Sequence, residues 1–168
     1  TDAELAAHLA AVTGRLLLEV RDCGVCAGTA LGKAGDQTAN QYLVHAIRAA
    51  RPDDGLLSEE MKCDGTRLGQ RRVWIVDPVD GTREYGEGRT DWAVHVALTV
   101  DGVATVGAVA LPALGLVLRS DRPTPLLPLG DPPRMVVSRT RPPALALSVA
   151  AAIGATLVPM GSSGAKAM

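Results

Sequence analysis

A chain of 168 residues, of which 47% are hydrophobic, is long enough to bury the core of one globular domain. Lys and Arg number 17 against 18 Asp and Glu, so the chain lacks the basic excess that neutralises nucleic-acid phosphates, and we expect no nucleic-acid polymer as partner. No apolar run approaches the roughly 20 residues of a membrane helix, and three cysteines are too few for a disulfide framework. These features predict a cytoplasmic protein without a membrane partner.

The first part of the chain predicts two helices. Apolar residues recur at three- and four-residue spacing over residues 3–20, and Thr1 or Asp2 can cap that helix. Residues 24–35 are rich in glycine and predict a connector. Asp36 is then placed to cap a second helix.

The middle of the chain predicts a sheet. The apolar run over residues 73–76 ends at Asp77 and Pro78, as a buried strand would. Alternating apolar and polar residues then predict an antiparallel meander, in which Asp101-Gly102 is a hairpin turn. The predicted strands are residues 55–58, 73–76, 92–100, 103–111 and 114–119.

The last part of the chain predicts a second set of elements. Five prolines make residues 121–133 a loop or linker, because proline cannot donate to a strand ladder. The elements predicted after it are a strand at 135–138, a helix at 142–153, a strand at 156–159 and the start of a helix after Gly161. We therefore predict one α/β domain, with an N-terminal part at 1–120, a connection at 121–133 and the beginning of a C-terminal part at 134–168.

Two carboxylates stand at the exit of the apolar strand and suggest chemistry. Asp77 and Asp80 are three residues apart, where their side chains can converge beyond the sheet. Mg²⁺ is usually held by a few carboxylates together with phosphate oxygens of a substrate. Gly81 allows close backbone approach, and a helix that begins there would direct free N–H groups at an anion. A capped turn is the alternative interpretation, since Asp, Pro and Gly are common turn residues.

Histidines and cysteines carry less weight. The three histidines lack a spacing that brings two of them together, so we interpret them as core or surface residues; they are His8, His45 and His95. Cys23 and Cys26 have the spacing of half a zinc site, but no second pair follows, so we interpret them as structural.

The string from Trp74 to Thr82 resembles the signature of the inositol monophosphatase superfamily, which is a Trp, two apolar residues and then Asp-Pro-apolar-Asp-Gly-Thr. Three further segments resemble family motifs in the same order: Ala-Gly-Asp at 34–36, Leu-Ser-Glu-Glu at 57–60 and Gly-Ser-Ser-Gly-Ala-Lys at 161–166. The continuation Thr-Arg-Glu-Tyr at 82–85 is similar to bisphosphate nucleotidases of the CysQ type. This resemblance implies a layered αβαβα sandwich, with a mostly antiparallel first sheet.

The resemblance also implies roles for individual residues. It implies two or three Mg²⁺ ions, held by Glu59, Asp77, the Val79 carbonyl and Asp80. It implies three catalytic residues, Thr82, Glu59 and Asp36. Thr82 and Glu59 would orient and deprotonate the attacking water, and Asp36 would hold a second water or an extra metal. The implied substrate contacts are Asp80, Gly81, Thr82, Gly161, Ser162, Ser163 and Lys166.

The implied activity is Mg²⁺-dependent, lithium-sensitive hydrolysis of the 3'-phosphate of 3'-phosphoadenosine 5'-phosphate, with 3'-phosphoadenosine 5'-phosphosulfate as a further substrate to consider. The expected partner is thus a small phosphorylated nucleotide, and a homodimer stays open. Inositol-1-phosphate or fructose-1,6-bisphosphate phosphatase is one alternative. A truncated, non-catalytic nucleotide-binding remnant is another, because family members are typically longer and their C-terminal part supplies a further metal-ligating aspartate.

Overall fold

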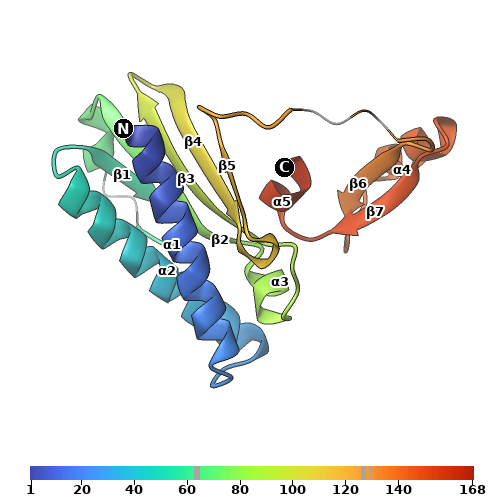
Figure 1. The fold of residues 1–168 in the computed structure, drawn as a ribbon, viewed down its shortest axis with the longest axis horizontal. Coiled ribbons are helices and arrows are strands. Elements are labelled where there is room, and N and C mark those ends of the chain that lie inside the picture. Colours follow the sequence, from blue (N-terminus) through green and yellow to red (C-terminus); the bar gives the residue numbers. More distant parts are fainter. Residues whose placement is uncertain (63–64, 126–127, 129) are drawn as a thin grey trace.

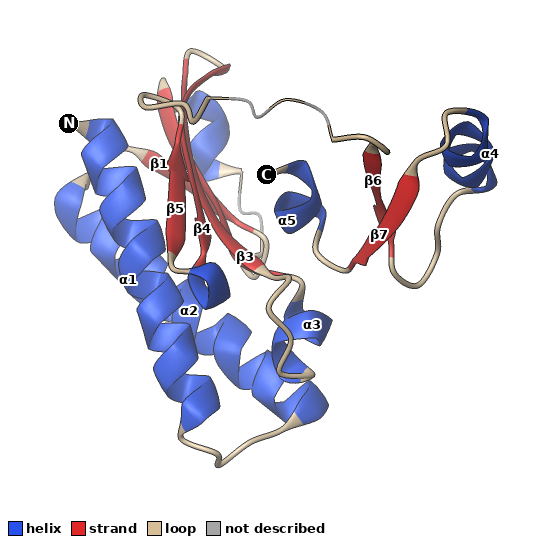
Figure 2. Ribbon diagram, turned by 45° about the vertical axis from the view of Figure 1, so that its right-hand side comes forward, coloured by secondary structure: helices blue, strands red, loops and turns tan. Residues whose placement is uncertain are grey.

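The computed structural model describes residues 1–62, 65–125, 128 and 130–168. Two long helices, α1 (Asp2–Asp22) and α2 (Gly28–Ala50), cover one face of a five-stranded sheet, as Figure 1 and Figure 2 show. A smaller unit of two strands and two short helices lies beyond the linker. The predicted α/β layering with a mostly antiparallel first sheet is confirmed.

Helix α1 begins as predicted, with Thr1 as its N-cap. The Thr1 hydroxyl accepts from the Glu4 backbone N–H at 3.2 Å, and the Glu4 carboxylate returns to Thr1, which completes a capping box. Its buried face includes Leu9 and Leu17, which pack onto the sheet. This apolar stripe explains why residues 2–22 form one continuous helix.

Helix α2 begins earlier than predicted. The predicted connector at 24–35 is wrong from Gly28 onward, because the helix begins there and Asp36 lies inside it instead of capping it. The physical reason is a row of buried residues at four-residue spacing that runs through the glycine-rich part: Leu31, Gly35, Ala39, Leu43 and Ile47. Packing of this row outweighs the low helix propensity of glycine.

The five-stranded sheet has the order β1-β2-β3-β4-β5. Its strands are β1 (Gly55–Ser58), β2 (Arg72–Asp80), β3 (Ala93–Val100), β4 (Val103–Leu111) and β5 (Leu116–Arg119). The β1–β2 pair is parallel and the other pairs are antiparallel, so the predicted meander is confirmed. Alternate residues of β2 and β3 form the core beneath the helices; Trp74, Val76, Val94 and Val96 are buried there.

Strand β2 is longer than the predicted 73–76. It continues through Asp77 and Pro78 to Asp80, and its register against β3 shifts between the two aspartates. Proline is tolerated at this irregularity, where a regular ladder hydrogen bond is not required of it. The shift places both aspartates at the C-terminal end of the strand, beside the first residues of helix α3 (Thr82–Gly86).

The smaller unit contains a parallel pair of strands, β6 (Arg134–Ser138) and β7 (Thr156–Met160), joined through α4 (Ala144–Ala152) and followed by α5 (Ser163–Ala167). These elements match the predicted strand, helix, strand and helix start. No helix or strand occurs in the described part of residues 120–133, as the prolines predict. Short 3₁₀ helices at Thr66–Gly69 and Pro112–Leu114 were not predicted.

None of the helices that the structure describes is both long and apolar enough to cross a membrane. Cys23 is exposed and Cys26 is half-buried, and both thiols are free. The third cysteine, Cys63, lies outside the described residues.

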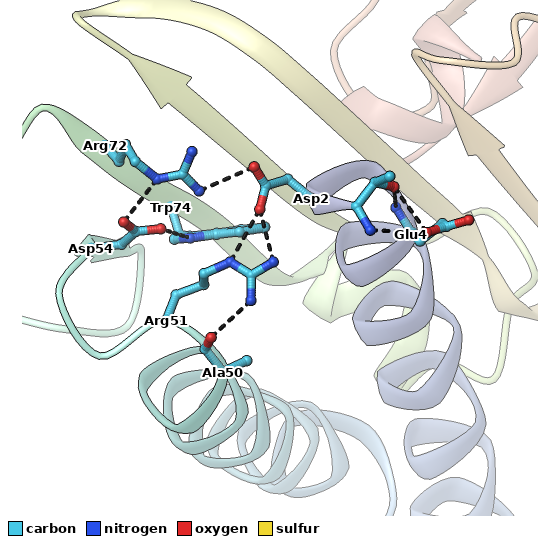
Figure 3. Close-up of polar contacts among 8 residues, drawn as sticks. Asp2, Glu4, Ala50, Arg51, Asp54, Arg72 and Trp74 are labelled. Atoms are coloured by element: carbon cyan, nitrogen blue, oxygen red, sulfur yellow. Dashed lines mark hydrogen bonds and ion pairs between the residues drawn. The ribbon is translucent and has the colours of Figure 1, made fainter.

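A polar network ties the start of α1 to the end of α2 and the start of β2 (Figure 3). The Asp2 carboxylate accepts from Arg51 Nη2 at 2.9 Å and from Arg72 Nη2 at 3.1 Å. Asp54 accepts from Arg72 Nε at 2.9 Å and from the indole N–H of the buried Trp74 at 2.8 Å. The network therefore satisfies a buried donor and fixes three elements relative to one another.

Replacing Asp54 by alanine is expected to lower the free energy of unfolding by about 1–3 kcal/mol, because the Trp74 indole N–H and one Arg72 donor lose their acceptor. Chemical denaturation followed by tryptophan fluorescence measures the change. The neighbouring Asp53 is exposed, so Asp53→Ala is the matched control and should change stability by less than about 0.5 kcal/mol. Equal losses in both variants would contradict the assignment.

Candidate active site

The predicted residues of the central signature meet where β2 passes into α3. Asp77, Val79 and Asp80 end the strand, Gly81 forms the turn and Thr82 is the first residue of α3. Gly81 has φ +92°, and a Cβ atom there would lie 2.9 Å from Cβ of Ser162. Both the backbone angle and the close contact therefore require glycine at this turn.

Thr82 is oriented by two acceptors. Its hydroxyl lies 3.2 Å from Oδ1 of Asp36 and 3.1 Å from the carbonyl oxygen of Val79, so one hydrogen is shared between them. Asp36 comes from the middle of α2, 46 residues away in sequence. The structure therefore brings together the predicted catalytic residues Thr82 and Asp36, although the sequence analysis paired Thr82 with Glu59.

The acidic side chains of the site perturb one another. Burial, together with the charges of Glu60 and Glu59, raises the pKa of Asp36 to about 6. The hydrogen bond from Thr82 lowers this pKa but does not outweigh the other effects. Burial and the charges of Glu59 and Asp80 raise the pKa of Asp77 to about 7. These carboxylates are thus crowded, half-buried and short of positive charge.

Asp80 behaves in the opposite way. Burial alone would raise its pKa, but hydrogen bonds from His95, Ser162 and the Gly164 N–H outweigh burial and lower the pKa to about 2. Ser162 Oγ donates to Oδ2 at 2.8 Å, the Ser163 N–H donates to Oδ1 at 3.2 Å, and the Gly164 N–H also donates to Oδ2. Asp80 is therefore held ionised by the segment that precedes and opens α5.

His95 contacts the candidate site, which its interpretation as a core or surface residue did not anticipate. Its Nε2 lies 3.1 Å from Oδ2 of Asp80, and in the sheet it pairs with Asp77. The connection between β2 and β3 runs through α3, so no short hairpin fixed that register in advance. His8 and His45 are exposed, which agrees with their interpretation as surface residues.

Glu59 and Glu60 follow β1 and lie beside the site. The Glu59 backbone N–H donates to the Val76 carbonyl at 3.3 Å, and both side chains are exposed. Among the described residues, no three His, Cys, Asp or Glu side chains converge closely enough to form a metal site. The ligand set Glu59, Asp77, Asp80 and the Val79 carbonyl therefore stays a prediction.

The predicted substrate segment at 161–166 is held in place by contacts that the sequence did not predict. The Gly161 N–H donates to Asp91 at 2.7 Å, and Arg89 pairs with the same carboxylate at 2.7 Å. Arg139, which follows β6, contacts Glu84 of α3 at 2.6 Å. Nothing in the local sequence signals the Gly161–Asp91 and Arg139–Glu84 contacts, since their members are 70 and 55 residues apart.

Lys166 is occupied within its own turn. Its Nζ donates to the carbonyl oxygens of Gly161 and Ser162 at 2.6 and 2.8 Å. Ser162 Oγ accepts from the Ala165 N–H at 2.9 Å while it donates to Asp80. Of the predicted contacts in this segment, Ser163 is the exposed one.

A helix-covered sheet with acidic side chains at the C-terminal end of β2 is the arrangement to be compared with known proteins. Comparison of the sequence identifies the family. The chain belongs to the inositol monophosphatase family, whose model matches residues 9–125. The family is metal-dependent, usually on Mg²⁺.

Individual relatives agree with this family. The chain is 50% identical to the 3'-phosphoadenosine 5'-phosphate phosphatase of Mycobacterium leprae, over all of this chain and 68% of that protein. It is 49% identical to the protein of the same name from Mycobacterium tuberculosis, over 92% of this chain and 62% of that protein. The chain therefore spans about two thirds of the length of these relatives.

The fold is shared with a solved member of the family. CysQ from Bacteroides thetaiotaomicron matches with a TM-score of 0.75 over 98% of this chain and 74% of that chain, at 21% sequence identity. The match includes the smaller C-terminal unit as well as the helix-covered sheet, because almost the whole chain is aligned.

Proposed function

We propose that the protein to which this chain belongs is a Mg²⁺-dependent phosphatase that removes the 3'-phosphate of 3'-phosphoadenosine 5'-phosphate to give AMP and phosphate. The observation that carries the proposal is the Thr82–Asp36 hydrogen bond, placed beside Asp77 and Asp80 at the end of β2. The choice of substrate is supported by the names of relatives about 50% identical to the chain.

The predicted ligands have the chemistry that Mg²⁺ takes, although in this structure the described side chains do not converge on one point. Burial raises the pKa values of Asp36 and Asp77, and the charge of Glu59 raises both further, so a bound cation would relieve this repulsion. Carboxylate and carbonyl oxygens are the ligands that Mg²⁺ prefers. Glu59, Asp77, Asp80 and the Val79 carbonyl would hold the ions. When bound, Mg²⁺ supplies charge neutralisation at the phosphoryl group and lowers the pKa of water.

Thr82 and Asp36 provide a route for a proton. The Thr82 hydroxyl donates to Asp36, so its oxygen keeps a lone pair that can accept a hydrogen bond from a water. As that water attacks phosphorus and the bond between phosphorus and the 3'-oxygen breaks, the water proton passes to Thr82 Oγ1 and the threonine proton passes to Asp36 Oδ1. The departing 3'-oxygen takes a proton from solvent. Because Asp36 already accepts the Thr82 hydrogen bond, it is the group placed to receive this proton.

The segment over residues 161–164 contacts the Asp80 carboxylate and is suited to position the nucleotide. Ser162 and Gly164 are committed to Asp80 in this structure, whereas the Ser163 side chain is exposed and free to meet a ribose or base. Lys166 stabilises the turn through the Gly161 and Ser162 carbonyls, so its contribution to binding is indirect.

Phosphate release from the full-length protein tests the proposal. We expect turnover of 3'-phosphoadenosine 5'-phosphate to exceed that of inositol-1-phosphate and fructose-1,6-bisphosphate by at least about tenfold in kcat/KM, equivalent to about 1.4 kcal/mol. EDTA should abolish the activity and added Mg²⁺ should restore it, while Li⁺ should inhibit. Preference for another of these phosphates would change the substrate, and activity undiminished by EDTA would exclude the metal mechanism.

A further inference from the structure

Helix α3 lies so close to α2 that glycines are needed at the contact. A Cβ atom on Gly32 would lie 2.9 Å from Cγ2 of Thr82 and 3.2 Å from its carbonyl oxygen. A Cβ atom on Gly35 would lie 2.5 Å from the ring of Tyr85. Real Cβ atoms essentially never lie closer than 3.0 Å to such neighbours, so a side chain at either position would push the two helices apart.

Helix α3 cannot fix its own position. It has five residues, too few for a helix that is stable without tertiary contacts. Its anchor is the fully buried Tyr85, whose hydroxyl donates to the Leu17 carbonyl at 2.7 Å and whose ring packs edge-on against Trp92 at 5.0 Å. Tyr85 anchors α3, so the position of the first residue of this helix, Thr82, depends on how closely the neighbouring surface of α2 lets it approach.

We propose that Gly32 is a positioning residue for Thr82. Gly32 precedes Asp36 by four residues and so lies one turn away on the same face of α2. The missing side chain at position 32 lets the Thr82 methyl group rest on the helix, and this brings Thr82 Oγ1 to 3.2 Å from Asp36. The inference rests on the proposed function, because it assigns Gly32 to the proton route through Thr82.

A double-mutant cycle between Gly32→Ala and Thr82→Ser tests the proposal in the full-length protein. Serine keeps the hydroxyl and lacks the Cγ2 atom with which an alanine at position 32 would clash. In the wild-type background, Gly32→Ala should lower kcat about tenfold or more while KM changes little, since the displaced group acts on the water and not on the nucleotide. In the Thr82→Ser background, the same substitution should lower kcat by less than about threefold.

Thermal unfolding of the metal-free protein gives a second readout that needs no activity. Alanine ordinarily stabilises a helix interior relative to glycine, so a lower Tm for Gly32→Ala reports the clash. The decrease should be smaller when residue 82 is serine. A residual decrease is expected in both backgrounds, because the Thr82 carbonyl oxygen also lies close to the added atom.

Gly14→Ala is the matched control. A Cβ atom on Gly14 of α1 would lie 2.7 Å from Cγ of Pro112, a slightly closer clash than that at Gly32 and with a residue outside the site. This variant should lower the Tm without a change in kcat and without rescue by Thr82→Ser.

Three results would overturn the proposal: an unchanged kcat in Gly32→Ala, an equal loss of kcat in both backgrounds, or an equal loss of kcat in Gly14→Ala. If the wild-type protein released no phosphate from any tested substrate, the proposed function would fail. The Tm cycle would then still decide whether Gly32 sets the position of Thr82.

Discussion

Replacing Thr82 by alanine in the full-length protein is expected to lower the turnover of 3'-phosphoadenosine 5'-phosphate by about 10²-fold or more, the usual scale for a positioned proton transfer. The variant loses the hydroxyl that donates to Asp36 and that, in the proposed mechanism, links the attacking water to this carboxylate. The carboxylates that would hold Mg²⁺ remain, so the Mg²⁺ concentration at half-maximal activity should change by less than about threefold. Initial rates of phosphate release over a Mg²⁺ titration measure both quantities.

Thr82→Ser is the control for this experiment, since serine retains the hydroxyl. Its turnover should stay within about tenfold of the wild-type value, because only the methyl contact with α2 is lost. Wild-type turnover in Thr82→Ala would remove Thr82 from the mechanism. A large loss of Mg²⁺ affinity in that variant would instead assign the residue to metal binding.

Replacing Asp77 by asparagine should stabilise the metal-free protein above neutral pH. The pKa of Asp77 is raised from an ordinary 3.8 to about 7, so the folded protein holds this proton more tightly than the unfolded chain does. The associated stability is complete below about pH 4 and is lost as the pH rises through about 7. A shift of this size corresponds to at most about 4 kcal/mol, and because the carboxyl group is partly exposed we expect about 1–2 kcal/mol.

Denaturation in EDTA at pH 5 and pH 8 measures this difference. Asp77→Asn should exceed the wild type in stability at pH 8 and match it more closely at pH 5, because the asparagine side chain carries no charge at either pH. Added Mg²⁺ should stabilise the wild type at pH 8 and have much less effect on the variant. Asp53→Asn, which removes a charge from an exposed position, should show neither effect. A wild-type response to Mg²⁺ in Asp77→Asn would exclude that residue as a ligand.

Local patterns predicted most of the secondary structure. Alternation located β3 to β5, and the apolar spacing located α1, because each signal is contained within one element. The start of α2 was missed because glycine usually interrupts helices, whereas here Gly32 and Gly35 are the residues that let α3 approach. Helix propensity describes an isolated segment, whereas packing against α3 and the sheet determines where α2 begins.

The candidate site could be predicted only where it follows a contiguous motif. The stretch from Asp77 to Thr82 was recognised directly, and the structure places it at the end of β2 as expected. The contacts of His95 and Asp91 could not be predicted, because their partners are brought to them by the sheet register and by the loop before α5. The metal ligands themselves stay a prediction that the Asp77→Asn experiment addresses.

The wide sequence separation of the site contacts has a consequence for how the protein folds. Asp36 and Thr82 are 46 residues apart, and Asp80 and Gly164 are 84 residues apart. Contacts of such high contact order form slowly, since the entropy of closing long loops is lost before the contacts compensate it. Helices α1 and α2 and the hairpin of β3 and β4 need only local contacts to start. We therefore expect the contacts between Asp80 and residues 162–164, which close the longer of these loops, to form after the local contacts, so that a nascent chain acquires secondary structure before it acquires the complete candidate site.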